Sequence, residues 1–176
     1  MKKGLIHIYC GDGKGKSTAA IGLAVRAAGR GFKVFIIQFL KDQKTGELVS
    51  MAKIPEISVL RGQDYGAAFT WQMTDQQKEK CRLQHNEMLK QGITAAKNGQ
   101  VDVLILDEVI AAYNLNLVDH KLLTDFLTTK PESLEVILTG RDPAPELAAM
   151  ADYVSEIKKI KHPFDQGIKA RKGIEN

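Results

Sequence analysis

The chain has 176 residues, of which 44% are hydrophobic and 26% are charged, and its formal net charge at pH 7 is +4. Its two cysteines, Cys10 and Cys81, are too few and too far apart for a disulfide framework, and no apolar run approaches the ~18 residues of a membrane span. We therefore expect one domain over residues 1–176, in a reducing, cytoplasmic compartment and without membrane association.

An apolar stretch at residues 5–10 predicts a buried strand, and it runs into a glycine-rich loop and then a helix over about residues 16–29. The loop glycines permit backbone angles that turn successive amide N–H groups toward phosphate oxygens. Lys16 is expected to act as a point charge on terminal phosphates, and the Ser17 hydroxyl is placed to coordinate Mg²⁺. The predicted ligand is a nucleoside triphosphate. The residues expected to contact it here are Gly11, Asp12, Gly13, Lys14, Gly15, Lys16, Ser17 and Thr18.

Two short apolar segments at residues 33–39 and 57–60 predict the next strands, and the longest helix is expected over residues 74–98. Thr74 and Gln77 have the spacing of a capping box at the start of this helix. Its predicted apolar stripe comprises Cys81, Met88, Leu89, Ile93 and Ala96.

His85 lies on the same stripe of this helix. A metal-ligand role is the alternative to a packed histidine, but the helical spacing places no second metal-binding side chain beside it. A packed or interface histidine is therefore favoured.

A strand expected at residues 101–106 ends in Asp107 and Glu108. This position puts the carboxylates at the carboxyl end of a strand, beside the phosphate loop. Asp107 is the predicted magnesium-associated acid. Glu108 could activate water in a hydrolytic ATPase, bind a ribose hydroxyl or have a structural partner, and the sequence does not separate these roles.

The remaining elements are a helix at about residues 119–129, a strand at 134–138, a short helix beginning near residue 143 and a last strand at 153–157. Arg141 follows the strand at 134–138, so it is expected at the ligand-binding edge of the sheet. There it could bind phosphate or carboxylate, and a surface ion pair is the equal alternative.

The alternation of strands and helices predicts an α/β fold, a P-loop NTPase-like (RecA-like) domain with helices on both faces of a mainly parallel sheet of five or six strands. Residues 159–176 form a basic C-terminal tail. The charge permits a nucleic-acid partner but does not demand one, and none is expected.

Several segments together resemble the ATP:corrinoid adenosyltransferases. The resemblance covers nearly the whole chain, and the Phe-Thr-Trp and His-Pro-Phe segments make it specific. Cys10 stands where the usual phosphate loop begins with glycine, a departure that the family shares. The matching segments are the loop at residues 11–18, residues 66–71, 106–108 and 139–141, and residues 161–170.

The resemblance implies transfer of the 5′-deoxyadenosyl group of ATP to cobalt(I) of a corrinoid, in adenosylcobalamin biosynthesis or salvage. Cobalt(I) attacks the 5′ carbon of the ribose, inorganic triphosphate leaves, and no general base is needed. The family binds triphosphate in reversed polarity over its loop, with Lys16, the loop amides and Mg²⁺ stabilising the departing charge. A homodimer and a reductase that supplies electrons are the further partners implied.

Phe69 and Trp71 match the family's aromatic residues that occupy the lower face of the corrinoid. By removing the lower axial ligand of cobalt(II), such residues make its reduction easier. From the residues alone, the favoured interpretation is a loop that these aromatic side chains anchor in the core. The family match favours a place in the corrinoid site instead. Better-known members also carry an N-terminal helical extension over the corrinoid. Because this chain begins close to its first strand, we expect a more exposed corrinoid or a cover from another segment, such as residues 162–172.

Two other functions use the same loop. A nucleotide or small-molecule kinase would release ADP, and would need an acid or base aligned with an acceptor hydroxyl. A RecA-like ATPase that binds nucleic acid would use the basic tail and Trp71, and its polynucleotide binding would depend steeply on salt.

Overall fold

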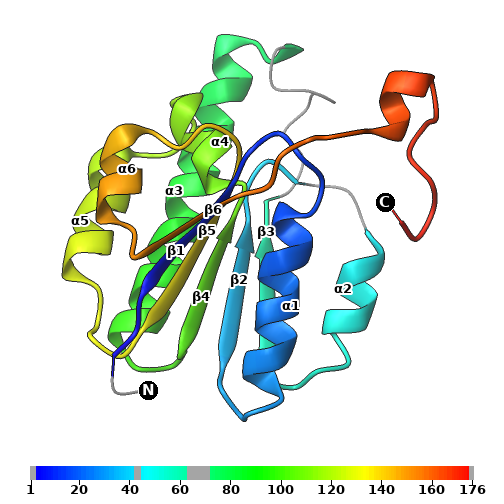
Figure 1. Cartoon of the computed structure of the whole chain (residues 1–176). Helices are drawn as coiled ribbons and strands as arrows, with labels where there is room; N and C mark the ends of the chain where they lie inside the picture. The colour runs from blue at the N-terminus through cyan, green and yellow to red at the C-terminus, as the bar shows by residue number, and fades with distance from the viewer. Residues whose placement is uncertain (1–2, 42–44, 63–71, 175–176) are drawn as a thin grey trace.

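A computed structural model describes residues 3–41, 45–62 and 72–174 of the chain (Figure 1). Among these residues, six parallel strands form one sheet in the order β3-β2-β4-β5-β1-β6. The predicted parallel α/β sheet is therefore confirmed, with every described pairing parallel. The strands are β1 (Ile6–Cys10), β2 (Val34–Gln38), β3 (Ile57–Arg61), β4 (Val103–Asp107), β5 (Glu135–Thr139) and β6 (Tyr153–Glu156).

Helices cover both faces of this sheet, as Figure 1 shows. Side chains alternate along each strand, so β4 presents Leu104 and Leu106 to one apolar cluster and Val103 and Ile105 to another. The first cluster also includes residues of α3 to α6, and the second includes residues of α1 and α2. The helices are α1 (Lys16–Ala28), α2 (Gly46–Met51), α3 (Asp75–Lys97), α4 (Val109–Asn114), α5 (His120–Thr129) and α6 (Pro145–Met150).

Small side chains let α1 lie close to the sheet. Ala20 and Ala24 are fully buried and Ala27 is nearly so, while Leu23 of the same predicted face is only partly buried. The close approach matters for the site, because the first turn of α1 carries Lys16 and Ser17 from the phosphate loop.

The start of α3 has the predicted capping box. Thr74 Oγ1 accepts a hydrogen bond from the Gln77 amide at 3.3 Å, and Gln77 Oε1 accepts one from the Thr74 amide at 2.8 Å. The predicted apolar stripe of α3 is buried along its length, and His85 within it is fully buried. The prediction of a packed histidine is confirmed.

Three short elements were not predicted: α2, α4 and a single turn of 3₁₀ helix, η2 (Pro163–Gln166). None is long enough to show a hydrophobic period. The predicted boundaries otherwise differ by a few residues, and Asp107 is the last residue of β4 rather than the residue after it. Within the described ranges, none of the helices combines the length and the apolar character needed to cross a membrane.

The fold brings three loops to one edge of the sheet. β1 pairs with β5 and β5 pairs with β4, all in parallel, so the carboxyl ends of these three strands lie side by side. The loops that leave them contain the glycine-rich segment, Glu108 and Arg141. These predicted site residues, distant in sequence, are therefore brought together.

Candidate phosphate-binding site

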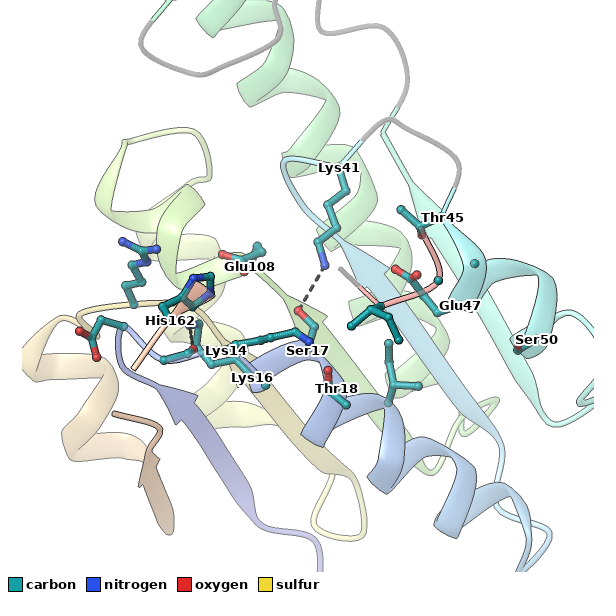
Figure 2. Close-up of a pocket in the computed structure, with 18 residues that line it drawn as sticks. Lys14, Lys16, Ser17, Thr18, Lys41, Thr45, Glu47, Ser50, Glu108 and His162 are labelled. Carbon is teal, nitrogen blue, oxygen red and sulfur yellow. Dashed lines mark hydrogen bonds between the residues drawn. The ribbon is translucent and has the colours of Figure 1, made fainter. Parts of the chain in front are cut away.

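A cavity of about 820 Å³ opens at this edge, and Figure 2 shows the residues around it. The glycine-rich loop and the first turn of α1 form one wall, from Asp12 to Thr18. Glu108 and Arg141 line it from the loops after β4 and β5. The structure thus places these predicted nucleotide-binding residues around a single cavity.

The loop is wrapped around the side chain of Lys16. The ammonium donates hydrogen bonds to the carbonyl oxygens of Gly11 at 2.8 Å and Gly13 at 2.9 Å, and the residue is 9% exposed. Gly11 and Gly15 have positive φ angles of 99° and 126°, which a residue with a side chain rarely adopts. The loop conformation therefore depends on glycine at these two positions.

Cys10 explains why the first glycine of the usual pattern is dispensable. It is the last residue of β1, and it is not among the described non-glycine residues with positive φ. Its side chain is buried, with Sγ 3.7 Å from the carbonyl oxygen of Ser155. A buried strand end accepts a small apolar side chain, so glycine is not required there.

Asp107 is fixed at the carboxyl end of β4 by four donors. Its Oδ1 accepts hydrogen bonds from the hydroxyls of Ser17 and Thr139, each at 2.7 Å. Its Oδ2 accepts from Gln38 Nε2 at 3.0 Å and from the Lys41 ammonium at 2.6 Å. Asp107 as a whole residue is 1% exposed, and these contacts fill the acceptor positions of its carboxylate.

The charge of Asp107 follows from two opposed effects. Burial raises the pKa of this carboxyl, whereas the Lys41 ammonium and the hydroxyls of Thr139 and Ser17 lower it, and the net shift is downward. Asp107 is therefore held as a carboxylate despite its burial, as a group that attracts a cation must be.

Ser17 and Asp107 are suited to Mg²⁺ by their chemistry. A hydroxyl and a carboxylate in contact supply the oxygen ligands that Mg²⁺ prefers, and this ion usually takes its remaining ligands from water and substrate phosphates. In the described part of the chain no group of three or more His, Cys, Asp or Glu residues could hold a metal ion. A metal bound here would therefore rely on phosphate oxygens as well as on the protein.

Glu108 has an unusual backbone that turns it toward the cavity. It caps α4 with a left-handed φ of 61°, and its amide donates a hydrogen bond to Thr139 Oγ1 at 2.9 Å. Burial, and then the neighbouring Asp107 charge, raise the pKa of the Glu108 carboxyl. This carboxyl is thus more readily protonated than an exposed glutamate.

Arg141 lines the same cavity and is exposed. Gly140 before it has a φ of 152° and packs so tightly that an added Cβ would lie 2.5 Å from Ile110 Cβ. The turn that presents Arg141 is consequently fixed by its packing against α4.

Sequence reasoning missed Lys41 and the wall formed by α2. Lys41 follows β2 at the same sheet edge, and its ammonium contacts both Ser17 and Asp107. Arg61 on β3 donates to Gln38 Oε1 at 2.5 Å and to Thr45 Oγ1 at 2.8 Å, which ties the start of α2 to the neighbour of Asp107. A polar residue just after a predicted strand was the available signal for Lys41.

The C-terminal tail begins against the phosphate loop. The Ile157 carbonyl accepts a hydrogen bond from the Gly13 amide at 2.8 Å, and the Lys159 amide donates one to Asp12 Oδ1 at 3.0 Å. Further along, His162 lines the cavity, as Figure 2 shows. Of residues 162–172, which were expected as a cover of the corrinoid, His162 thus lies beside the phosphate site. Phe69 and Trp71, the predicted corrinoid residues, lie outside the described residues.

Comparison with known proteins adds a family to this geometry. A family model described as ATP:corrinoid adenosyltransferase BtuR/CobO/CobP matches residues 2–176. A corrinoid adenosyltransferase from Sinorhizobium sp is 36% identical over 177 residues, and the match covers 99% of this chain and 81% of that protein. Corrinoid adenosyltransferases from Pseudomonas aeruginosa and Escherichia coli K12 are each 31% identical over 175 residues, covering 99% of this chain and 84% and 86% of those proteins.

Solved structures resemble this one in fold. A KaiC-like protein from Pyrococcus horikoshii aligns with a TM-score of 0.58 and 15% identity, over 90% of this chain and 75% of that one. The EssC ATPases 2 and 3 from Geobacillus thermodenitrificans align with a TM-score of 0.52 and 16% identity, over 97% of this chain and 35% of that one. These likenesses confirm the predicted RecA-like fold class, and at such identities they concern the fold alone.

Proposed function

This chain belongs to the ATP:corrinoid adenosyltransferase family, and we propose that its phosphate loop holds the triphosphate of ATP while the adenosyl group is transferred to a corrinoid. The observation that carries this proposal is the preformed loop around Lys16, at the wall of a cavity large enough for a nucleotide. The family activity itself is adenosyl transfer from ATP to a corrinoid.

The loop residues act on the leaving group. As the bond between the 5′ carbon and its oxygen breaks, negative charge grows on the triphosphate. Lys16 and the loop amides stabilise that charge electrostatically, in a site that is already formed. Cobalt(I) of the substrate is itself the nucleophile and carries no proton, so the reaction requires no proton transfer to a protein base.

Ser17 and Asp107 would hold Mg²⁺ at the triphosphate. The hydroxyl and the carboxylate are in contact, and Asp107 is kept ionised by its surroundings. When bound, the ion supplies charge neutralisation on the phosphate oxygens. Asp12, Lys14 and Thr18 line the same cavity and complete the contacts on the loop side.

Glu108 and Arg141 are assigned to different groups of the nucleotide. Arg141 has the planar donor geometry that suits phosphate oxygens. Glu108, with its raised pKa, is suited to a hydrogen bond with a ribose hydroxyl. Both assignments rest on cavity-facing positions together with the chemistry of each side chain.

Phe69 and Trp71 are assigned to the lower face of the corrinoid, on the strength of their match to the family segment. There they would exclude water or the nucleotide tail from the lower axial position of cobalt(II). We further propose a cytoplasmic homodimer supplied with electrons by a reductase. In this proposal residues 1–176 form one domain, and residues 159–176 form a basic tail.

The loop assignment is tested by ATP binding to Lys16→Ala. Hydrogen bonds between charged groups contribute about 1.5–3 kcal/mol, so we expect roughly a 10- to 100-fold loss of ATP affinity by calorimetry in the presence of Mg²⁺. Lys121→Ala is the control, because Lys121 is an exposed residue of α5 paired with Asp125. Equal affinity for ATP in both variants would remove the phosphate-loop assignment.

A further inference from the structure

The ammonium of Lys41 lies against both side chains assigned to the metal. Its Nζ is 3.2 Å from Ser17 Oγ and 2.6 Å from Asp107 Oδ2. Figure 2 shows the Lys41 side chain extending toward Ser17 across the cavity, with the contact drawn as a dashed line. The ammonium therefore has the same two oxygen neighbours that Mg²⁺ would have.

Charge and space prevent the ammonium and a divalent cation from sharing these neighbours. The Asp107 carboxylate already accepts from Ser17, Thr139, Gln38 and Lys41, which fills its acceptor positions. A metal ion coordinated here would bring a second cation into contact with the ammonium, in a site where the Asp107 side chain is 2% exposed. Repulsion between like charges is strong when so little water screens them.

The backbone before Lys41 is anchored on both sides of its turn. The Phe39 amide donates to the Asp107 carbonyl at 2.9 Å, and the Leu40 amide donates to Nε2 of the buried His85 at 3.3 Å. Leu40 has a φ of 58°, a conformation that a bulky residue rarely adopts. This turn places the backbone of Lys41 so that its side chain begins close to Asp107.

The Lys41 side chain can also reach a second position, in the cavity beside the phosphate loop. It is 27% exposed, and it lines the same cavity as the phosphate loop. An ammonium on a four-carbon stem can turn from Asp107 toward phosphate oxygens in this cavity while its backbone stays in place.

We propose that Lys41 is the resident cation of the metal position in the nucleotide-free protein, and that its ammonium moves onto the triphosphate when Mg²⁺ and ATP bind together. This inference rests on the proposed assignment of Mg²⁺ to Ser17 and Asp107. In this proposal the Lys41 ammonium pairs with the Asp107 carboxylate in the absence of nucleotide and with the triphosphate in its presence. The proposal also makes divalent-metal binding dependent on the nucleotide, because the metal alone must displace an ammonium without offering it another anion.

The test is to measure Mn²⁺ binding without nucleotide. The concentration of free Mn²⁺ is monitored through its electron paramagnetic resonance signal. We expect Lys41→Met to bind Mn²⁺ at least tenfold more tightly than the unmodified protein, and Lys41→Arg to bind it as weakly as the unmodified protein. Lys121→Met is the matched control, since it removes one positive charge from an exposed position on α5. Mn²⁺ affinity of Lys41→Met no higher than that of Lys121→Met would overturn the proposal.

A second readout guards against a folding defect in Lys41→Met. Mn²⁺ without nucleotide should raise the melting temperature of Lys41→Met, and of the milder Lys41→Gln, more than that of the unmodified protein. Equal shifts in all three proteins would contradict the proposal.

Failure of the underlying metal assignment is recognised separately. If Asp107→Asn binds Mn²⁺ with ATP as tightly as the unmodified protein, then Asp107 is not associated with the metal. If Asp107→Asn weakens that binding while Lys41→Met leaves Mn²⁺ binding without nucleotide unchanged, the metal assignment is supported and the proposed role of Lys41 is wrong.

Discussion

Gly13 and Ile157 are joined by a backbone hydrogen bond, in which the Gly13 amide donates to the Ile157 carbonyl at 2.8 Å. The contact is close enough that a Cβ on Gly13 would lie 2.7 Å from that oxygen, and one on Gly11 would lie 2.4 Å from it. The segment that follows β6 therefore rests directly on the phosphate loop. This contact fixes the loop from outside while the carbonyls of Gly11 and Gly13 hold Lys16 from inside.

Gly11→Ala should damage both stability and nucleotide binding. The new methyl group would meet backbone atoms of Ile157, at a position with a φ of 99°. Strain and overpacking of this kind cost about 2 kcal/mol or more in free energy of unfolding, and displacement of the loop should weaken ATP binding at least tenfold. Chemical denaturation and calorimetry measure the two effects.

Gly22→Ala is the matched control for this change. Gly22 lies inside α1, and a Cβ there meets nothing within 4 Å. We expect the free energy of unfolding of this variant to be higher by roughly 0.5–1 kcal/mol, and its ATP binding to be normal. If Gly11→Ala behaved like Gly22→Ala, the loop would not depend on its contact with Ile157.

His85 should make the protein less stable in mild acid. Burial lowers the pKa of His85 from its ordinary 6.5 to about 4, and the hydrogen bond to the Leu117 carbonyl offsets only part of this shift. The neutral ring accepts a hydrogen bond from the Leu40 amide and donates one from Nδ1 to that carbonyl. Between these two pH values the unfolded chain binds more protons than the folded one, so stability falls as pH falls. The loss approaches roughly 3 kcal/mol by pH 4 and is absent above about pH 7.

The measurement is urea denaturation at pH 7, 6 and 5 for the unmodified protein and for His85→Gln, which lacks a titrating ring. His85→Gln should be less stable at pH 7, because its amide replaces a ring that satisfies two buried backbone groups. Its stability should also fall less steeply between pH 6.5 and 5. Parallel pH profiles for the two proteins would show that His85 does not titrate as described.

Trp71→Ala should separate nucleotide binding from corrinoid chemistry. If Trp71 occupies the lower face of the corrinoid, its removal lets a ligand return to the lower axial position of cobalt(II). We expect unchanged ATP affinity and loss of the four-coordinate cobalt(II) signal in electron paramagnetic resonance, with Trp71→Phe retaining part of the signal. A normal signal from Trp71→Ala would remove this residue from the corrinoid site.

The parts of the fold predicted from the sequence are those set by local pattern. The glycine-rich loop, the capping box of Thr74 and Gln77 and the buried strand ending at Asp107 depend on residues close together in the chain. Parallel strands then bring their carboxyl ends to one edge, so Lys16, Asp107 and Arg141 could be assigned to one site before any coordinates were known.

What the sequence could not predict depends on long-range packing. Lys41 and Asp107 are 66 residues apart, and their contact requires β2 to pair with β4. The strand order, the seating of Ile157 on the loop and the left-handed start of α4 at Glu108 likewise arise from contacts between distant segments. Short helices such as α2 lack the length to show a period.

The most direct measurement is an anaerobic reaction with ATP, Mg²⁺ and chemically reduced cobalamin or cobinamide, in which the loss of cobalt(I) absorbance and both products are followed together. We predict one adenosylcorrinoid and one intact triphosphate for each ATP consumed. Release of ADP or inorganic phosphate without adenosylcorrinoid, from either substrate, would contradict the account and favour a kinase or an ATPase.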